Sequence, residues 1–156
     1  MVKTADAVSN ACARIDVDPG CLGVWYDLGS ELTSLSGTKL TRETGSVAVF
    51  GDLYHVIAGG KVPPITMTVS GVYSEVPSEA FDLIKTLWET PGISDCDKCI
   101  AVRWIPKGGT PGDSMFAMLA AQLVGFKYPE LDASSASPIT FEFDVFGYIT
   151  SDTFVS

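Results

Sequence analysis

The chain has 156 residues, enough for one domain with a sizeable core, and we expect a single domain over residues 1–156. With 46% hydrophobic and 19% charged residues, the composition is that of a folded protein and excludes a disordered chain. The net charge of -9 argues against a protein that grips nucleic acid, because such binding needs clustered Lys and Arg. Mean hydropathy is high at +0.26, yet no apolar run is long enough to cross a bilayer. We therefore expect a subunit interface rather than a membrane partner.

The N-terminal third is predicted to hold an arm and then short strands. Residues 1–20 are expected to form an N-terminal arm, with a short strand over residues 11–17 that the Asp-Pro-Gly sequence at 18–20 ends. Residues 22–35 alternate loosely between apolar and polar side chains. Residues 46–54 are rich in β-branched and aromatic side chains and are predicted to form a strand.

The clearest strand follows Pro63-Pro64, a pair that favours an extended backbone. Its apolar side chains are expected on one face: Ile65, Met67, Val69 and Tyr73. Its polar side chains are expected on the other face: Thr66, Thr68 and Ser70. One face then belongs to a core, and the other faces water or a polar channel.

One segment, about residues 78–90, carries a helical period. Its apolar side chains recur at the 3.6-residue spacing and form a stripe for the core: Ala80, Phe81, Ile84, Leu87 and Trp88. Ser78 is expected to cap the start, and Pro91-Gly92 to end the helix. The sequence therefore predicts one amphipathic helix that packs on a sheet.

The C-terminal third is predicted to be mainly strand. Residues 100–105 form a strand, and residues 115–126 are compatible with either helix or strand. In the final strand, residues 139–149, apolar side chains alternate with polar ones: Phe141, Phe143 and Val145 against Thr140, Glu142 and Asp144. The predicted fold is mainly β: an antiparallel β-sandwich or open barrel with one flanking α-helix.

Four cysteines raise the question of disulfides or a metal. The N-terminal segment lacks the charged start and apolar run of a signal peptide, so reduced thiols are expected. Cys96 and Cys99 form a CxxC, but a zinc site usually adds a second such pair or histidines, and His55 is the one histidine. Loop thiols are favoured over a metal site or redox motif, and no metal is expected.

No catalytic constellation stands out in the sequence. A nucleophilic triad needs a base, and no Ser or Cys signature surrounds His55. Phosphate-binding glycine motifs are missing. Glu142 and Asp144 share one face of a strand, where a solvated row is the favoured interpretation over acid–base catalysis. We therefore expect a structural protein with no enzymatic activity and no cofactor.

Several short segments follow one another in a particular order: Trp25 to Leu35, Thr41 to Gly45 followed by Val47 to Asp52, Gly60 to Glu75, the helix over residues 79–89, Val102 to Trp104, Gly109 to Gly112, and Tyr128 to Pro138. Their order resembles the major tail tube protein family of long-tailed, siphovirus-like bacteriophages. Each string carries little information, and the ordered series over about residues 22–150 carries the resemblance. The cysteine loop and the Gly29-Ser30 order depart from the family pattern.

The resemblance implies a virion protein that is assembled in the host cytoplasm. Its subunits form hexameric rings that stack into a hollow tube, and each subunit contributes strands to an inner β-barrel. The implied partners are further copies of the chain, a tape measure protein and a tail terminator. DNA passes through the lumen without specific binding.

The alternation of the two best strands suggests which side chains line such a lumen. The candidates are the polar residues Thr66, Thr68, Ser70, Thr140, Glu142 and Asp144. Acidic side chains there would repel phosphate and limit friction. The alternatives are a related ring protein, such as a tail terminator or a secretion-system tube subunit, and a monomeric β-barrel that binds a small molecule.

Overall fold

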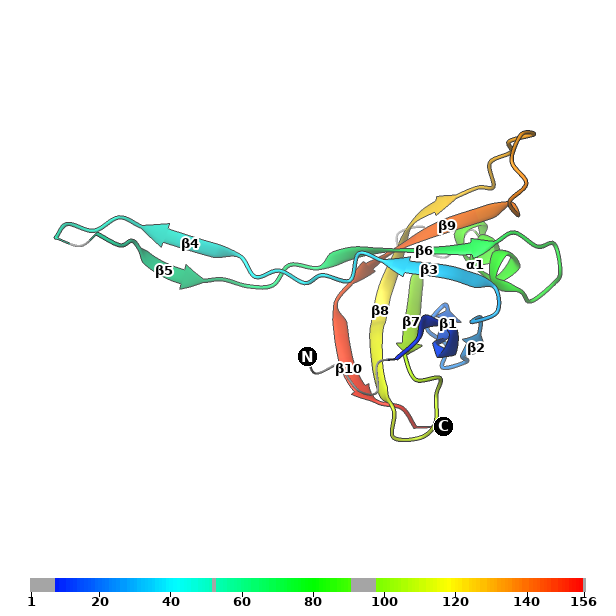
Figure 1. The fold of residues 1–156 in the computed structure, drawn as a ribbon, viewed down its shortest axis with the longest axis horizontal. Helices are drawn as coiled ribbons and strands as arrows, with labels where there is room; N and C mark the ends of the chain where they lie inside the picture. The colour runs from blue at the N-terminus through cyan, green and yellow to red at the C-terminus, as the bar shows by residue number, and fades with distance from the viewer. Residues whose placement is uncertain (1–7, 52, 91–97, 156) are drawn as a thin grey trace, which may run out of the picture.

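The computed structural model describes residues 8–51, 53–90 and 98–155 (Figure 1). The N-terminal elements are η1 (Asn10–Cys12), β1 (Arg14–Pro19), β2 (Tyr26–Asp27), β3 (Leu32–Ser36), β4 (Thr44–Val47) and β5 (Val56–Gly59). They are followed by β6 (Ile65–Val72), α1 (Ala80–Glu89), β7 (Cys99–Ile105), β8 (Ser114–Lys127), β9 (Thr140–Gly147) and β10 (Ile149–Thr153).

Eight strands form one antiparallel sheet that bends into two layers. The strand order is β2-β1-β7-β8-β9-β6-β3, and β10 also pairs with β8. The long strand β8 joins the layers, because its first half pairs with β10 and its second half pairs with β9. A register shift between Leu123 and Gly125, together with φ of +48° at Ala120, marks irregular backbone in this strand. The predicted mainly β fold with one helix is therefore confirmed.

The core lies between the two layers and under α1. Phe141 and Phe143 are almost fully buried and stack with their ring centroids 6.2 Å apart. From the helix, Ala80, Phe81 and Ile84 are buried, and Leu87 and Trp88 pack against the core as partly buried side chains. Residues 115–126, which are compatible with helix or strand by sequence, lie within β8.

The helix begins differently from the sequence expectation. Its N-cap is Glu79, and Ser78 lies before it with a left-handed φ of +67°. The Ser78 N–H donates to Asp82 Oδ2 at 3.0 Å. The side chain of Asp82, rather than that of Ser78, therefore stabilises the backbone at the start of the helix. The expected end at Pro91-Gly92 lies outside the described residues.

The short strand expected over residues 11–17 is present in part, because β1 spans residues 14–19 and its Val17 is fully buried. A second N-terminal expectation differs from the structure. Residues 46–54 do not form one strand, because β4 ends at Val47 and the chain turns back into β5 at Val56. β-Propensity predicted an extended backbone there, but Gly51, with φ of +82°, allows the reversal.

The strands β4 and β5 form a hairpin that projects far from the body of the molecule (Figure 1). Every described residue from Ser36 to Lys61 is exposed. The four residue pairs of the β4–β5 ladder hold the hairpin together, helped by the Glu43 N–H, which donates to the Lys61 carbonyl at 2.9 Å. Within the described residues, no helix is long and apolar enough to cross a membrane.

Candidate assembly surfaces

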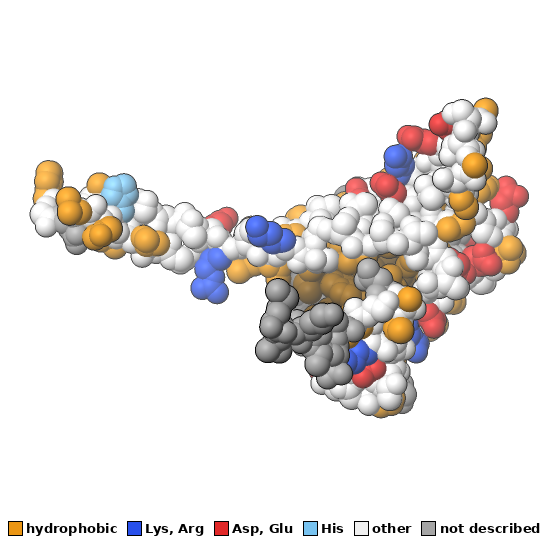
Figure 2. Space-filling model, viewed as in Figure 1, with side chains coloured by type: hydrophobic (Ala, Val, Ile, Leu, Met, Phe, Trp, Pro, Cys, Tyr) orange, Lys and Arg blue, Asp and Glu red, His pale blue; other side chains and the backbone are white. Residues whose placement is uncertain are grey.

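The outer half of the hairpin exposes a cluster of apolar side chains that we call the hairpin tip. Its members are Val47, Val49, Phe50, Leu53, Tyr54, Val56 and Ile57. Phe50 has a relative exposure of 108% and Leu53 of 95%, so neither packs on its own subunit. Figure 2 shows these apolar side chains gathered toward the far end of the hairpin. Exposed apolar clusters of this kind mark interaction sites.

The sequence carries a signal for this surface, although β-propensity by itself predicts only a strand there. Residues 46–57 combine many apolar side chains with little charge, a pattern that indicates burial. The pattern does not indicate which molecule supplies the burial. In the subunit, every described residue of this segment is exposed, including His55.

A second surface is the polar face of the layer β3-β6-β9-β8. Thr68 lies opposite Asp144 in the register of β6 and β9, and Ser70 lies opposite Glu142. The Thr68 hydroxyl donates to Asp144 Oδ1 at 2.8 Å. The structure thus brings these four lumen candidates together on one face. Thr66 and Thr140 continue the same face toward its two ends, where they lie opposite Phe146 and Val72.

Two further side chains on this face were not singled out from the sequence. Lys127 lies opposite Glu142 in the register of β8 and β9, and its Nζ is 3.7 Å from Glu130 Oε2. Phe146 lies opposite Thr66 and is 40% exposed. The face is therefore polar but mixed in charge, rather than uniformly acidic. The pairing of β8 with β9 could not be inferred from the alternation of either strand alone.

One glycine allows the polar face to pack closely. A Cβ at Gly125 would lie 2.6 Å from Asp144 Oδ2, which is too close for an unstrained contact. Gly125 therefore leaves room for the carboxylate of Asp144 across the strand pair. The same position lies directly after the register shift in β8.

The layer that carries the polar face has open hydrogen-bonding edges in the described part of the chain. At one edge, β3 pairs with β6 and with no other described strand. At the other edge, Gly125 to Lys127 of β8 pair with β9, whereas the ladder between β7 and β8 ends at Gln122. Open edges are sites where another chain can add a strand.

A buried ion network ties the other layer together. Asp16 is fully buried and accepts hydrogen bonds from Arg14 Nε and Arg103 Nε, each at 2.8 Å. Arg103 also stacks over the Trp25 ring at 4.3 Å, and both arginines lie over the Phe154 ring at 5.3 Å. The hydrogen bond with Asp16 raises the pKa of Arg14 above its ordinary value. The network joins β1, β7 and the C-terminal segment.

Glu31 lies at the end of the β3–β6 pair, in surroundings that disfavour its negative charge. Its Oε2 atom is shielded from water and has no hydrogen-bond partner in the described residues. Desolvation raises the pKa of Glu31, and the negative charges of Glu79 and Asp27 raise it further. Deprotonated Glu31 therefore opposes folding slightly.

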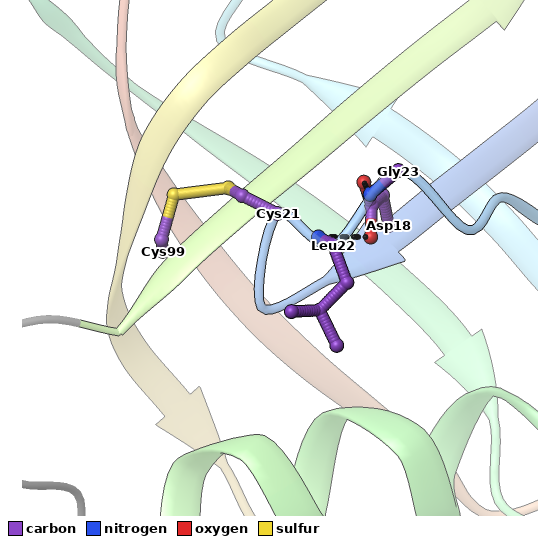
Figure 3. Close-up of a disulfide and its surroundings, with 5 residues drawn as sticks. All are labelled: Asp18, Cys21, Leu22, Gly23 and Cys99. Carbon is purple, nitrogen blue, oxygen red and sulfur yellow. Dashed lines mark hydrogen bonds between the residues drawn. A yellow bond between two sulfur atoms is a disulfide. The ribbon is translucent and has the colours of Figure 1, made fainter.

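The cysteine expectation is wrong for two of the four residues. Cys21 and Cys99 form a disulfide (Figure 3) with a Cα–Cα distance of 5.7 Å. Cys12 is free and exposed, and Cys96 lies outside the described residues. Because 78 positions separate Cys21 from Cys99, only the pairing of β1 with β7 brings them together. Among the described residues, no group of three or more His, Cys, Asp and Glu side chains could hold a metal ion.

Several solved structures have a similar fold. A chain from the sheath–tube complex of an extracellular contractile injection system (PVC) matches with a TM-score of 0.66 and 15% identity, over 90% of this chain and 88% of that chain. A chain from the cap that terminates the tube of the anti-feeding prophage matches with a TM-score of 0.71 and 11% identity, over 98% and 95%. A chain from the virion of a native gene transfer agent matches with a TM-score of 0.60 and 9% identity, over 96% and 100%.

These likenesses establish a shared fold over nearly the whole chain. The same fold occurs in a contractile injection system, in a cap that terminates a tube and in a gene transfer agent particle. No protein-family model matches the sequence, and the curated proteins contain no significant match to it.

Proposed function

We propose that this chain is a non-enzymatic structural subunit of a phage-type tail tube. Copies form hexameric rings, and the rings stack into a hollow conduit for DNA within the virion tail. Assembly takes place in the host cytoplasm, with a tape measure protein and a tail terminator as partners. The observation that carries the proposal is the layer β3-β6-β9-β8, which has one buried face, one polar face and two edges that no other described strand pairs with.

The geometry of this layer suits ring closure. Its four strands alternate in direction, so β3 and β8 at opposite edges run antiparallel to each other. The β3 edge of one copy can therefore pair with the β8 edge of the next in the same antiparallel sense. Repeating this contact around a closed ring removes every open edge of the layer. Barrels of about 16–18 strands already enclose an aqueous channel.

The hairpin supplies a second contact between copies. The hairpin projects away from the body of its subunit, so the exposed apolar side chains of its tip can be buried only by another molecule. At ordinary transfer free energies, each large apolar side chain contributes about 1.5–3 kcal/mol on full burial. A heterologous contact of this kind extends an assembly rather than closing a pair.

Electron microscopy of the purified protein tests the proposal. We expect rings or rods at high protein concentration. A monodisperse monomer without rings or rods would contradict the proposal.

Variants of the hairpin separate folding from assembly. Phe50→Asp combined with Leu53→Asp should keep the thermal midpoint of the subunit while preventing rods, because both side chains contact solvent in the isolated chain. Leu131→Asp is the matched control, since Leu131 is 82% exposed but lies outside the hairpin. Rods from the hairpin variant, or their loss in the control alone, would count against a role of the hairpin in assembly.

The polar face is the proposed lumen wall, and its charge can be reversed. Glu142→Lys with Asp144→Lys should leave tubes intact but hinder DNA passage, because lysines bind the phosphate backbone. Lys127 already offsets part of the acidic charge of this face. We therefore expect either single lysine substitution to hinder DNA passage only modestly. Glu142→Gln with Asp144→Asn is the control for charge removal. Plaque yield in a complementation assay, with tube formation scored alongside, gives the readout.

A tail terminator is the second candidate function, because one of the similar structures comes from a cap that terminates a tube. A secretion-system tube subunit is a further alternative within the same architecture. A terminator should stop at a single ring, whereas a tube subunit should form rods of many rings. The same micrographs therefore separate these functions.

A further inference from the structure

We propose that the disulfide between Cys21 and Cys99 is a redox-dependent staple: the subunit folds with both thiols reduced, and oxidation then locks the fold. The two cysteines lie where the β1–β2 turn meets the start of β7 (Figure 3). The bond closes a loop that contains the hairpin, β6 and α1. The staple thus constrains the segment that carries the exposed apolar tip.

Hydrogen bonds hold the two cysteines close without the disulfide. The ladder between β1 and β7 extends to the pair Pro19 and Ile100. Beyond it, the Gly20 N–H donates to the Cys99 carbonyl at 2.9 Å. Cys99 is therefore fixed beside the residue that precedes Cys21. The backbone pairing places both thiols within reach once the sheet has formed.

The turn that carries Cys21 is also held independently. Asp18 is 4% exposed, and its carboxylate accepts hydrogen bonds from the backbone N–H groups of Leu22 at 3.1 Å and Gly23 at 2.8 Å (Figure 3). These bonds fix the chain on the far side of Cys21. A preorganised pair of thiols has a high effective concentration, so oxidation should be efficient and reduction should leave the fold in place.

Redox partners can reach the bond. Cys21 and Cys99 are each partly exposed, and the neighbouring Leu22 is 79% exposed. With oxidised glutathione as the oxidant, one cysteine thiolate attacks the glutathione disulfide and releases one glutathione thiolate. The second cysteine thiolate attacks the mixed disulfide and releases the other. The protein loses two electrons and two protons overall, and two glutathione thiols are formed.

The expected gain comes from the unfolded chain. A cross-link across 78 positions removes much of the conformational freedom of that state, and long loops give a large effect in the chain-entropy account. For a chain of this size, the expected rise in the thermal midpoint is about 10 °C. In a tail tube, and resting on the proposed function, the staple would let subunits assemble while reduced and stiffen the particle after release into oxidising surroundings.

The experiment uses the full chain with Cys12→Ser and Cys96→Ser, so that Cys21 and Cys99 are the remaining thiols. We expect oxidised glutathione to link the two cysteine-bearing peptides in a non-reducing digest analysed by mass spectrometry. The thermal midpoint should rise by about 10 °C over that of the dithiothreitol-treated protein. Far-UV circular dichroism at 25 °C should be the same in both states. Adding Cys21→Ser is the control, and its midpoint should not respond to redox conditions.

Three results would overturn the proposal. The peptides could remain unlinked after oxidation, the two midpoints could agree within about 1 °C, or the reduced protein could be unfolded at 25 °C. The last result would make the bond a requirement for folding rather than a switch. Rods are scored separately on the same samples. A stapled subunit that never forms rods would contradict the proposed function and leave the staple standing.

Discussion

The body and the hairpin of this protein are built from the same kinds of residues, but they meet very different environments. In the body, Phe141 and Phe143 alternate with polar side chains and are 1% exposed. In the hairpin, Phe50 is fully exposed. β-Branched and aromatic residues favour extended backbone in both regions, yet only the body supplies a second layer to cover them. Apolar side chains that are left uncovered in one subunit indicate where the next molecule binds.

The largest expected effect comes from placing the same charge in each region. Phe143→Asp buries an unpaired carboxylate between the two layers and should lower the free energy of unfolding by roughly 4 kcal/mol or more. Phe50→Asp is the matched change in the hairpin and should alter it by less than about 0.5 kcal/mol. Urea unfolding of both variants gives the comparison. If Phe143→Asp folds normally and Phe50→Asp does not, the assignment of core and surface is inverted.

The next effect concerns the buried charge in the body. Asp16→Ala leaves Arg14 and Arg103 without their shared carboxylate and should cost about 3 kcal/mol of stability. Asp27→Ala is the control, because the Asp27 side chain is 57% exposed and lies 3.7 Å from Arg14. This control should cost less than about 1 kcal/mol. Similar losses of stability in both variants would show that the burial of Asp16 does not increase the cost of removing its carboxylate.

A smaller effect is expected at the junction of body and hairpin. Gly37 has φ of +82°, and a Cβ there would lie 2.8 Å from the Thr66 carbonyl oxygen. Gly37→Ala should therefore destabilise the subunit by about 1–3 kcal/mol through backbone strain and the close contact. Gly51→Ala at the tip shares the φ of +82° but has open space around it, so it measures the strain alone. Equal losses of stability in the two variants would show that the close contact with the Thr66 carbonyl oxygen adds no cost.

The smallest expected effect is a gain at Glu31. Its pKa is raised in the folded protein, so the folded state binds a proton more tightly than the unfolded state does. Stability from this group is present at low pH and is lost as the pH rises through the raised pKa. Glu31→Gln should thus be more stable than the parent at pH 7 by a few tenths of a kcal/mol, roughly the scale of exposed charge effects.

The pH dependence provides the check on Glu31. The advantage of Glu31→Gln should disappear as the pH falls through the raised pKa, when the parent side chain becomes neutral. Glu130→Gln in an exposed loop is the control and should show no such gain. Thermal midpoints measured from pH 4 to 8 would reveal the trend. A constant difference at every pH would mean that charge is not the cause.

Much of the fold could be predicted because it depends on local periodicity. The alternation in residues 65–73 and 139–149 indicates two half-buried strands, and the 3.6-residue period of residues 80–88 indicates a helix. The proposed lumen residues followed from the same alternation. The hairpin was missed because an apolar, β-rich run is typical both of a core strand and of an arm that another subunit buries.

The sequence by itself determined which side chains share a face of each strand or helix, because that depends only on backbone period. Only the tertiary structure decided which strands are neighbours. The pairing of β1 with β7 joined Cys21 to Cys99, and the pairing of β8 with β9 placed Lys127 beside Glu142. Such contacts connect residues that are far apart in the chain. Local preferences carry no information about them, because they arise only when layers pack and loops close.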